Sequence, residues 1–499
     1  MAQPNTRPAT TFAFDNSFAR SLEGFYVPWQ GEQAPKPRIA HLNEALAEQL
    51  GLSLDASDET LAAILAGSET AEGSEPIAQA YAGHQFGGFS PQLGDGRALL
   101  LGELLDTEGQ RFDLQLKGSG RTPFSRGGDG KAVLGPVLRE YIMGEAMHAL
   151  GIPTTRALAA VTTGEQIRRQ GLKPGAVLAR VASSHIRVGT FQFFAARGAW
   201  DGVSKLADYT IMRHYPELID KENRYLALFE AVARRQAQLI AQWMQVGFIH
   251  GVMNTDNVAL SGETIDYGPC AFMDQYDSAT VFSSIDRNGR YAYGSQPQIG
   301  QWNLARFAET LVPLIAPDDE NLAAELLTDA LTEYMASYKQ AWLTGMGRKI
   351  GLASAEGKDT ALIQILMGTL QGEHVDFTLF FRRLGDSLVS TEGKVALLAL
   401  FDDPEAIAGW LKDWQARLEE EGRPADATAE AMAKVNPIYI PRNHLVEAAL
   451  QKAEDFADLS EVRQLLDVLS NPYEERKGLE DYARPAPSDF GPFVSYCGT

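Results

Sequence analysis

The stretch HGVMNTDNVALSGETIDYG, residues 250–268, contains the combination of residues that decides the expected fold. His250 is followed seven residues later by Asn257, and Asp266 opens the triplet Asp-Tyr-Gly. Asparagine and aspartate oxygens are ligands that Mg²⁺ takes beside substrate phosphates. The triplet alone would fit an ordinary turn, but the whole combination of His250, Asn257 and Asp266 at this spacing is more specific than the triplet. The stretch therefore predicts a loop that holds a metal ion and phosphate.

The segments that precede this loop occur in an order known from protein kinases. A glycine-rich stretch, residues 81–97, comes before two predicted strands, the second of which ends at Lys117. A predicted helix over residues 135–151 then carries Glu140. Protein kinases place their phosphate loop, strand lysine, helix glutamate and metal-binding loop in this order. The order predicts an α+β, protein-kinase-like two-lobed fold.

The order of these segments does not by itself decide which side chain pairs with Lys117 or which residue acts as the base. Glu140 would hold the ammonium group of Lys117, but Glu145 on another face of the same helix is a rival partner. An unrelated surface lysine is the simpler alternative. Val252 stands where a kinase keeps its catalytic aspartate. This leaves open a transferase of another kind, a conventional kinase acting on a protein or small molecule, and a non-catalytic nucleotide-binding pseudokinase.

Two basic clusters do not belong to an ordinary kinase. The loop SRGGDGK, residues 125–131, can offer amides and positive charge to phosphates. Arg180 and Arg187 lie in a strand-like segment, where arginine forks suit phosphate oxygens, although strand arginines held in salt bridges are the simpler interpretation. Other nucleotide motifs fail, because position 125 is serine where a P-loop needs its first glycine.

Composition limits the classes of partner. The chain has 499 residues, of which 45% are hydrophobic, and a formal net charge of −21. An average field of that sign repels a phosphate backbone, so we expect no nucleic-acid partner. Two cysteines do not make a disulfide scaffold. The N-terminus lacks the apolar region of a signal peptide, and no apolar run suits a membrane span. We therefore expect a cytoplasmic protein without a membrane partner.

Changes in sequence character suggest four regions. Residues 1–75 are expected to form an N-terminal extension with two short helices, one within PRIAHLNEALAEQLGL (37–52) and one within SDETLAAILAG (57–67). Residues 76–200 would form a kinase-like lobe with the glycine-rich loop. Residues 201–300 would form the catalytic part of the second lobe. Residues 301–499 would be a large helical region ending in an extended tail.

Several long motifs make the chain similar to the selenoprotein O family. They are YAGHQFGGFSPQLGDGRALLLGE, DLQLKGSGRTPFSRGGDGKAVLGPVLREYIMGEAMHALGIPTTRALA, HGVMNTDN, IDYGPCAFMD and NPIYIPRNHLVEAAL. The resemblance covers the chain from about residue 10 to the cysteine near its end. It implies a kinase-like fold that binds ATP in a flipped orientation. AMP would pass to Ser, Thr or Tyr hydroxyls of proteins and pyrophosphate would leave, in a bacterial cytoplasm.

The same resemblance implies roles for individual residues. Lys117 and Glu140 would form the ion pair, Asn257 and Asp266 would bind Mg²⁺ or Mn²⁺, and Asp256 would accept the hydroxyl proton, although it could instead support the metal ligands or cap the loop. The ATP-binding residues would be Gly94, Gly96, Arg97, Lys117, Asp129, Gly130, Arg180, Arg187 and Asp266.

The two cysteines suggest a redox-sensitive link. Eukaryotic members carry selenocysteine near the C-terminus, where this chain has Cys497. Cys270 lies four residues after Asp266. A disulfide between Cys270 and Cys497 would tie the tail over the loop. Two separate thiols are the default in a reducing compartment.

Overall fold

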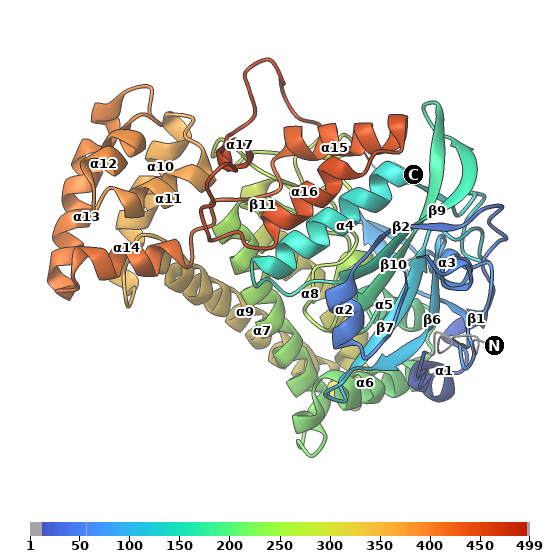
Figure 1. Ribbon diagram of the computed structural model, residues 1–499. Helices are drawn as coiled ribbons and strands as arrows, with labels where there is room; N and C mark the ends of the chain where they lie inside the picture. Colours follow the sequence, from blue (N-terminus) through green and yellow to red (C-terminus); the bar gives the residue numbers. More distant parts are fainter. Residues whose placement is uncertain (1–11, 56, 497–499) are drawn as a thin grey trace.

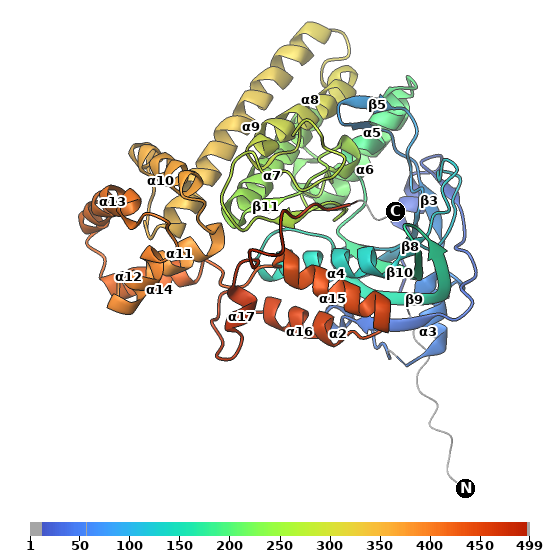
Figure 2. The same ribbon diagram turned by 90° about the horizontal axis from the view of Figure 1, so that it is seen from above.

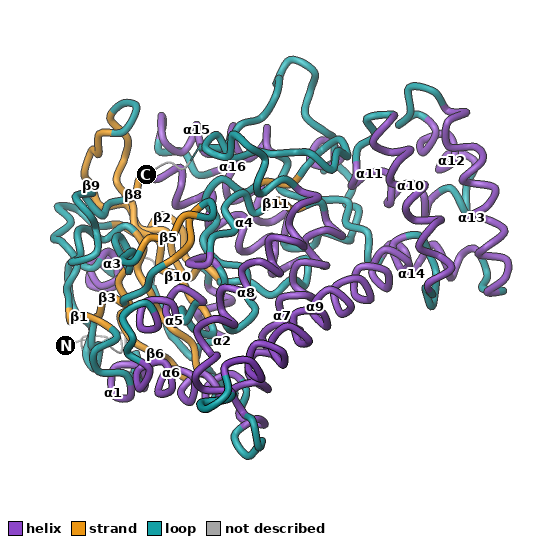
Figure 3. The backbone as a smooth tube through the Cα atoms, turned by 180° about the vertical axis from the view of Figure 1, so that it is seen from behind, coloured by secondary structure: helices purple, strands orange, loops and turns teal. Residues whose placement is uncertain are grey.

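The computed structural model describes residues 12–55 and 57–496 and combines one large sheet with many helices (Figure 1). The predicted mixed helix-and-sheet class is confirmed. Figure 3 shows the strands of the large sheet gathered at one end of the molecule, with most helices in the rest. The helices α10 to α14, which lie within residues 360–433, form a separate outer group at the opposite end (Figures 1 and 2).

The large sheet is antiparallel and has the strand order β1-β3-β6-β7-β10-β9-β2, with β8 beside β10. Its strands are β1 (Tyr26–Pro28), β2 (Arg38–Leu42), β3 (Ile77–Gln79), β6 (Ala98–Leu105), β7 (Arg111–Lys117), β8 (Ala132–Val133), β9 (Arg156–Arg168) and β10 (Leu172–Ala182). β1 and β2, which precede residue 76, lie at opposite ends of this order.

The register of β7 and β10 decides which side chains meet. Gln115 is paired with Arg180 across the two strands. Because side chains two residues apart on a strand share a face, Lys117 points to the same side as Gln115 and Arg180. Leu116 points to the other side and belongs to a separate apolar cluster with Leu61. The alternation thus separates a charged face from an apolar one.

Helices cover both faces. α3 (Glu59–Ala66) contributes Leu61 to the apolar cluster, and α4 (Leu134–Ala149) lies on the charged face, with Glu140 buried. The helix predicted over residues 135–151 is confirmed, and Gly151 follows its end with φ of +76°. α15 (Asn443–Phe456) and α16 (Ser460–Leu469) pack along α4 (Figure 1).

The first predicted short helix is partly wrong. Residues Arg38–Leu42 form strand β2, which pairs with β9, and the helix α2 (Glu44–Gln49) begins only after Asn43. Asn43 ends the strand and caps the helix, because its side chain accepts a hydrogen bond from the Leu46 amide at 3.1 Å. Leu42, which lies in the segment predicted to contain the helix, belongs to the strand. The second predicted helix is confirmed as α3, which Asp58 caps by accepting hydrogen bonds from the amides of Thr60 and Leu61.

The loop of residues 250–268 lies between the sheet and a helical layer. Strand β11 (Phe248–Ile249) follows the long helix α7 (Arg224–Val246) and pairs with β12 (Ala271–Phe272). The two ends of the loop therefore lie close together, at the β11–β12 strand pair. Within the described residues, every helix is too short or too polar to cross a membrane.

The remaining elements surround this core. The shorter ones are α1 (Ser17–Ser21), β4 (Gly83–Gln85), β5 (Gly88–Ser90), α5 (Val188–Ala195), α6 (Trp200–His214) and α17 (Glu480–Ala483). The helical layer contains α8 (Gln296–Ile315) and α9 (Glu320–Lys349), and the outer group contains α10 (Thr360–Gly372), α11 (Phe377–Asp386), α12 (Thr391–Leu398), α13 (Ala408–Glu421) and α14 (Ala425–Ala433).

Candidate active site

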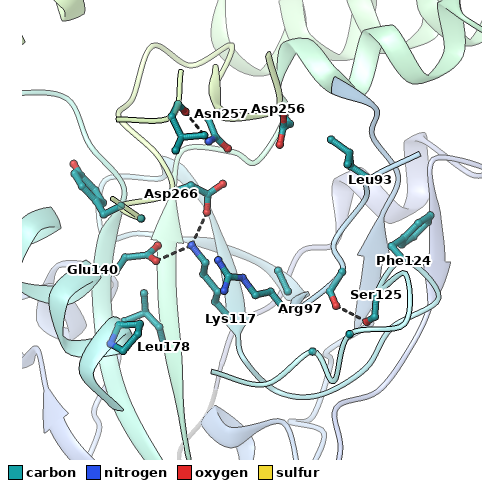
Figure 4. A pocket seen from close by; sticks show the side chains of 18 of the residues that line it. Leu93, Arg97, Lys117, Phe124, Ser125, Glu140, Leu178, Asp256, Asn257 and Asp266 are labelled. Atoms are coloured by element: carbon teal, nitrogen blue, oxygen red, sulfur yellow. Dashed lines mark hydrogen bonds and ion pairs between the residues drawn. The ribbon is translucent and has the colours of Figure 1, made fainter. Parts of the chain in front are cut away.

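A cavity of about 480 Å³ lies between the charged face of the sheet, α4 and the 250–268 loop (Figure 4). It brings together the residues that the sequence singled out for ATP, metal and catalysis. These are Gly94, Gly96, Arg97, Lys117, Asp129, Gly130, Glu140, Arg180, Arg187, Asp256, Asn257 and Asp266. Residues separated by up to 172 positions in the chain thus share one space.

Lys117 is held by two carboxylates. Its Nζ lies 2.7 Å from Glu140 Oε2 and 2.7 Å from Asp266 Oδ1 (Figure 4). Glu145, the rival partner, is engaged elsewhere, since its carboxylate accepts hydrogen bonds from the Arg156 guanidinium at 2.7 and 2.8 Å. The α4 position that faces the strand lysine is therefore Glu140.

Three cations converge on Asp266. Besides Lys117, Arg180 Nη1 lies 2.6 Å from Asp266 Oδ1, and Arg187 Nη1 lies 2.8 Å from Oδ2. Burial opposes the charge on Asp266, but the three cations outweigh it and hold the pKa of this carboxyl well below its usual value. The aspartate is thus charged and lies where three cationic side chains meet.

Both arginines are anchored rather than mobile. Arg180, whose side chain is 1% exposed, also donates to Glu140 Oε1 at 3.0 Å and to the Gln115 side chain. Arg187 donates to the backbone oxygen of Asp256 at 2.7 Å and lies over the Tyr81 ring at 4.6 Å. The guanidinium groups are therefore preorganised, which favours binding of a multiply charged anion.

The 250–268 loop offers two oxygen groups of different character. Asn257 donates its amide nitrogen to the Val252 carbonyl at 2.9 Å, which leaves the amide oxygen for a ligand. Asp256 is buried, and its Oδ1 has no hydrogen-bond partner among the described residues. Gln85 approaches the other oxygen at 3.4 Å. Burial raises the pKa of Asp256 to about 6, so the group can take up a proton near neutral pH.

The residues present fit a divalent metal that shares its coordination with substrate. Within residues 12–55 and 57–496, no cluster of three or more His, Cys, Asp or Glu side chains could form a complete protein cage. Asn257 and Asp266 both line the cavity and provide oxygen atoms. Mg²⁺ is commonly held by one or two protein ligands, with phosphate oxygens and water as the others.

The basic loop is fastened to the sheet. Asp129 accepts hydrogen bonds from both terminal nitrogens of Arg169 at 2.8 and 3.0 Å, and this contact lowers the pKa of Asp129. Gly130 has φ of +67°, and a Cβ atom there would lie 2.0 Å from the Gly120 carbonyl oxygen. The position therefore requires glycine. The loop can present backbone amides while Asp129 maintains its shape.

Sequence reasoning missed several residues that line the cavity. Tyr81 and Gln85 join it from one segment, and Arg169 and Tyr496 join it from two others. Tyr81 and Gln85 lie in the quoted glycine-rich stretch, which could have drawn attention to them, whereas Arg169 and Tyr496 carry no motif signal. Cys270 is buried, and the hypothesis of its disulfide involves Cys497, which lies outside the described residues.

Comparison with known proteins identifies the family. The model of the family "Protein adenylyltransferase SelO" matches residues 8–470. A protein nucleotidyltransferase YdiU of Cereibacter sphaeroides is 59% identical over 491 residues, which cover 98% of this chain and 100% of the relative. The YdiU of Rhizobium meliloti is 56% identical over 490 residues, which cover 98% of this chain and 100% of the relative. The YdiU of Rhizobium johnstonii is 55% identical over 498 residues, which cover 100% of this chain and 99% of the relative.

These matches extend over nearly the whole chain, so the resemblance inferred from the motifs is confirmed, as is the interpretation of the chain as an enzyme of the nucleotidyltransferase class. The chain belongs to the SelO family of protein adenylyltransferases.

Proposed function

We propose that this enzyme transfers AMP from ATP to Ser, Thr or Tyr hydroxyls of proteins, and that ATP lies in a kinase-like cleft with its phosphates turned inward. The observation that carries the proposal is the convergence of Lys117, Arg180 and Arg187 on one point deep in the cavity. A conventional kinase needs one lysine there. Two added arginines suit a triphosphate whose far end is buried and whose α-phosphate faces outward.

Separate groups of residues would bind the phosphates, the metal ion and the rest of the nucleotide. Lys117, Arg180 and Arg187 would bind the inward phosphates, and Glu140 would keep Lys117 in place. Asn257 and Asp266 would hold Mg²⁺ or Mn²⁺, which neutralises phosphate charge as the pyrophosphate leaves. Gly94, Gly96, Arg97 and Gly130 line the cavity and would contact the nucleotide.

Asp256 would accept the proton of the attacking hydroxyl. The hydroxyl oxygen forms a bond to the α-phosphorus, the bond from that phosphorus to the bridging oxygen breaks, and pyrophosphate leaves with the electron pair. The proton passes to the carboxylate of Asp256, a residue that lines the cavity. Val252 is buried and apolar, so the usual kinase position offers no base.

Replacing Asp256 with asparagine should lower kcat about 10²–10⁴-fold, the usual contribution of a general base. Affinities for ATP and for Mn²⁺ should stay unchanged, and steady-state kinetics with equilibrium dialysis would measure both. If Asp256 only supports the neighbouring metal ligand, the Asp256→Asn variant would lose metal affinity and recover kcat at high Mn²⁺, contrary to the proposal.

Paired reactions with ATP labelled at the α- or the γ-phosphate test the function itself. We expect label to enter protein from the α-position only. Label from the γ-position only would show a conventional kinase, and the roles assigned to Arg180, Arg187 and Asp256 would fall. ATP binding without transfer from either position would show a pseudokinase scaffold.

A further inference from the structure

We propose that a groove beside the nucleotide cavity binds an extended segment of the acceptor protein that carries an apolar and an acidic side chain near the modified hydroxyl. The inference rests on the proposed transfer of AMP to proteins. The groove encloses about 520 Å³, and its lining includes Phe86, Asn288, Arg290, Ser295, Gln298 and Ile299. We call it the acceptor groove.

The walls of the acceptor groove are prebuilt. One wall is the β4–β5 hairpin, whose turn carries Phe86 at φ of +50°. The opposite wall is the loop of residues 286–291, which forms around the buried carboxylate of Asp286. That carboxylate accepts hydrogen bonds from the amides of Arg290 at 2.9 Å and Tyr291 at 2.8 Å. Helix α8 supplies the floor next to the hairpin (Figure 2).

The groove is continuous with the catalytic loop. Asn254 lines the nucleotide cavity, and its side-chain oxygen accepts hydrogen bonds from the Phe86 amide at 3.1 Å and the Tyr291 hydroxyl at 2.6 Å. Gln85, next to Phe86, lines the same cavity and approaches Asp256. A polypeptide whose hydroxyl reaches Asp256 would therefore place its neighbouring residues over Phe86, since each extended residue spans about 3.3 Å.

The groove's charge indicates what the segment contains. The guanidinium group of Arg290 stacks over the Trp302 ring at 4.7 Å, and its buried Nε has no hydrogen-bond partner in the described chain. No ion pair among residues 12–55 and 57–496 includes Arg290. A cation without an ion-pair partner in the described chain is complementary to a carboxylate brought by a partner.

Exposed apolar side chains belong to the hairpin wall or adjoin the loop wall of the groove. Phe86 is 38% exposed, Phe89 on the same hairpin is 43% exposed, and Ile285 beside the loop is 52% exposed. Adjacent exposed apolar groups with a polar rim are typical of protein-binding surfaces. The combination favours a segment with both an apolar and an acidic side chain.

Peptide binding tests the inference without requiring turnover. The probes are two fluorescein-labelled nine-residue peptides with a central Thr and a nearby Phe, one carrying Glu and the other Lys beside it. The full chain, with an ATP analogue that cannot be cleaved between the α- and β-phosphates, should bind the Glu peptide about tenfold more tightly. Arg290→Glu should reverse this preference, and Phe86→Ser, which removes an apolar side chain from the lining, should weaken binding of both peptides.

A matched control and a kinetic readout separate the possible results. Lys434→Glu reverses an exposed charge after α14 and should leave peptide binding unchanged. In the transfer reaction, Arg290→Glu should raise KM for the Glu peptide about tenfold and leave KM for ATP unchanged. Equal binding of both peptides, or unchanged binding by Arg290→Glu, would overturn the acceptor groove. Selective binding without any transfer of α-label would instead overturn the proposed function.

Discussion

Replacing Asp266 with alanine is expected to abolish AMP transfer, with a fall in kcat of at least about 10³-fold. Asp266 provides one of the two proposed metal ligands and also the point on which Lys117, Arg180 and Arg187 converge. Without its charge, the metal loses a ligand, Arg187 loses its ion pair, and Lys117 and Arg180 share Glu140 alone. Transfer of α-label into protein, measured in steady state, gives the result.

Two comparisons identify the cause of this loss. Asp266→Asn retains the size of the side chain and removes its charge, so it should lose nearly as much activity as Asp266→Ala. Asp220→Ala, a change at an exposed position, should keep full activity. Circular dichroism would show that both Asp266 variants remain folded. Unchanged turnover in a folded Asp266→Ala variant would contradict the metal-dependent transferase and the kinase alternative together.

The sequence predicted the members of this site better than their contacts. Motif order brought Lys117 and Glu140 together, because an ion pair between strand and helix belongs to a known pattern. It did not predict that Arg180 joins them, since that depends on the register of β10 against β7. Register is set by hydrophobic patterning across a whole sheet. The shared contact on Asp266 follows from this three-dimensional pairing.

Two other differences have equally local causes. Leu42, Leu46 and Leu50 match helical spacing, but Leu42 belongs to β2 because a partner strand from residues 156–168 lies beside it. Tertiary pairing overrode the pattern. Asp129 was expected to contact the nucleotide, and it lines the cavity while Arg169 holds its carboxylate. That arginine lies 40 residues away in the chain, in the turn between β9 and β10, so no local sequence motif indicated the contact.

The motif NPIYIPRNH, residues 436–444, has a role that becomes visible only in the fold. Arg442 is fully buried and donates to Asp274 and Asp376, at 2.5 and 2.7 Å from Nη1. Asn443 donates to the Phe272 carbonyl at 3.0 Å. The motif therefore fastens the C-terminal helices to β12 and the residues just after it, on the segment that leads away from Asp266.

Replacing Arg442 with methionine is expected to lower the free energy of unfolding by about 3–5 kcal/mol, because it leaves buried carboxylates without their counter-ion. Methionine keeps much of the apolar stem, so the loss reports mainly the missing charge. Urea unfolding followed by tryptophan fluorescence would measure it. Arg484→Met, which removes an exposed arginine paired with Asp481, should change the same free energy by less than about 0.5 kcal/mol.

The pH dependence of this loss separates charge from packing. Burial raises the pKa of Asp376 even with Arg442 present, and removal of the guanidinium group would raise it further. A folded-state pKa above the unfolded value destabilises the fold at high pH and is relieved as protonation sets in. The difference in unfolding free energy between Arg442→Met and the native chain should therefore shrink as pH falls from 8 to about 5. A difference that is the same at both pH values would show that Arg442 acts through packing alone.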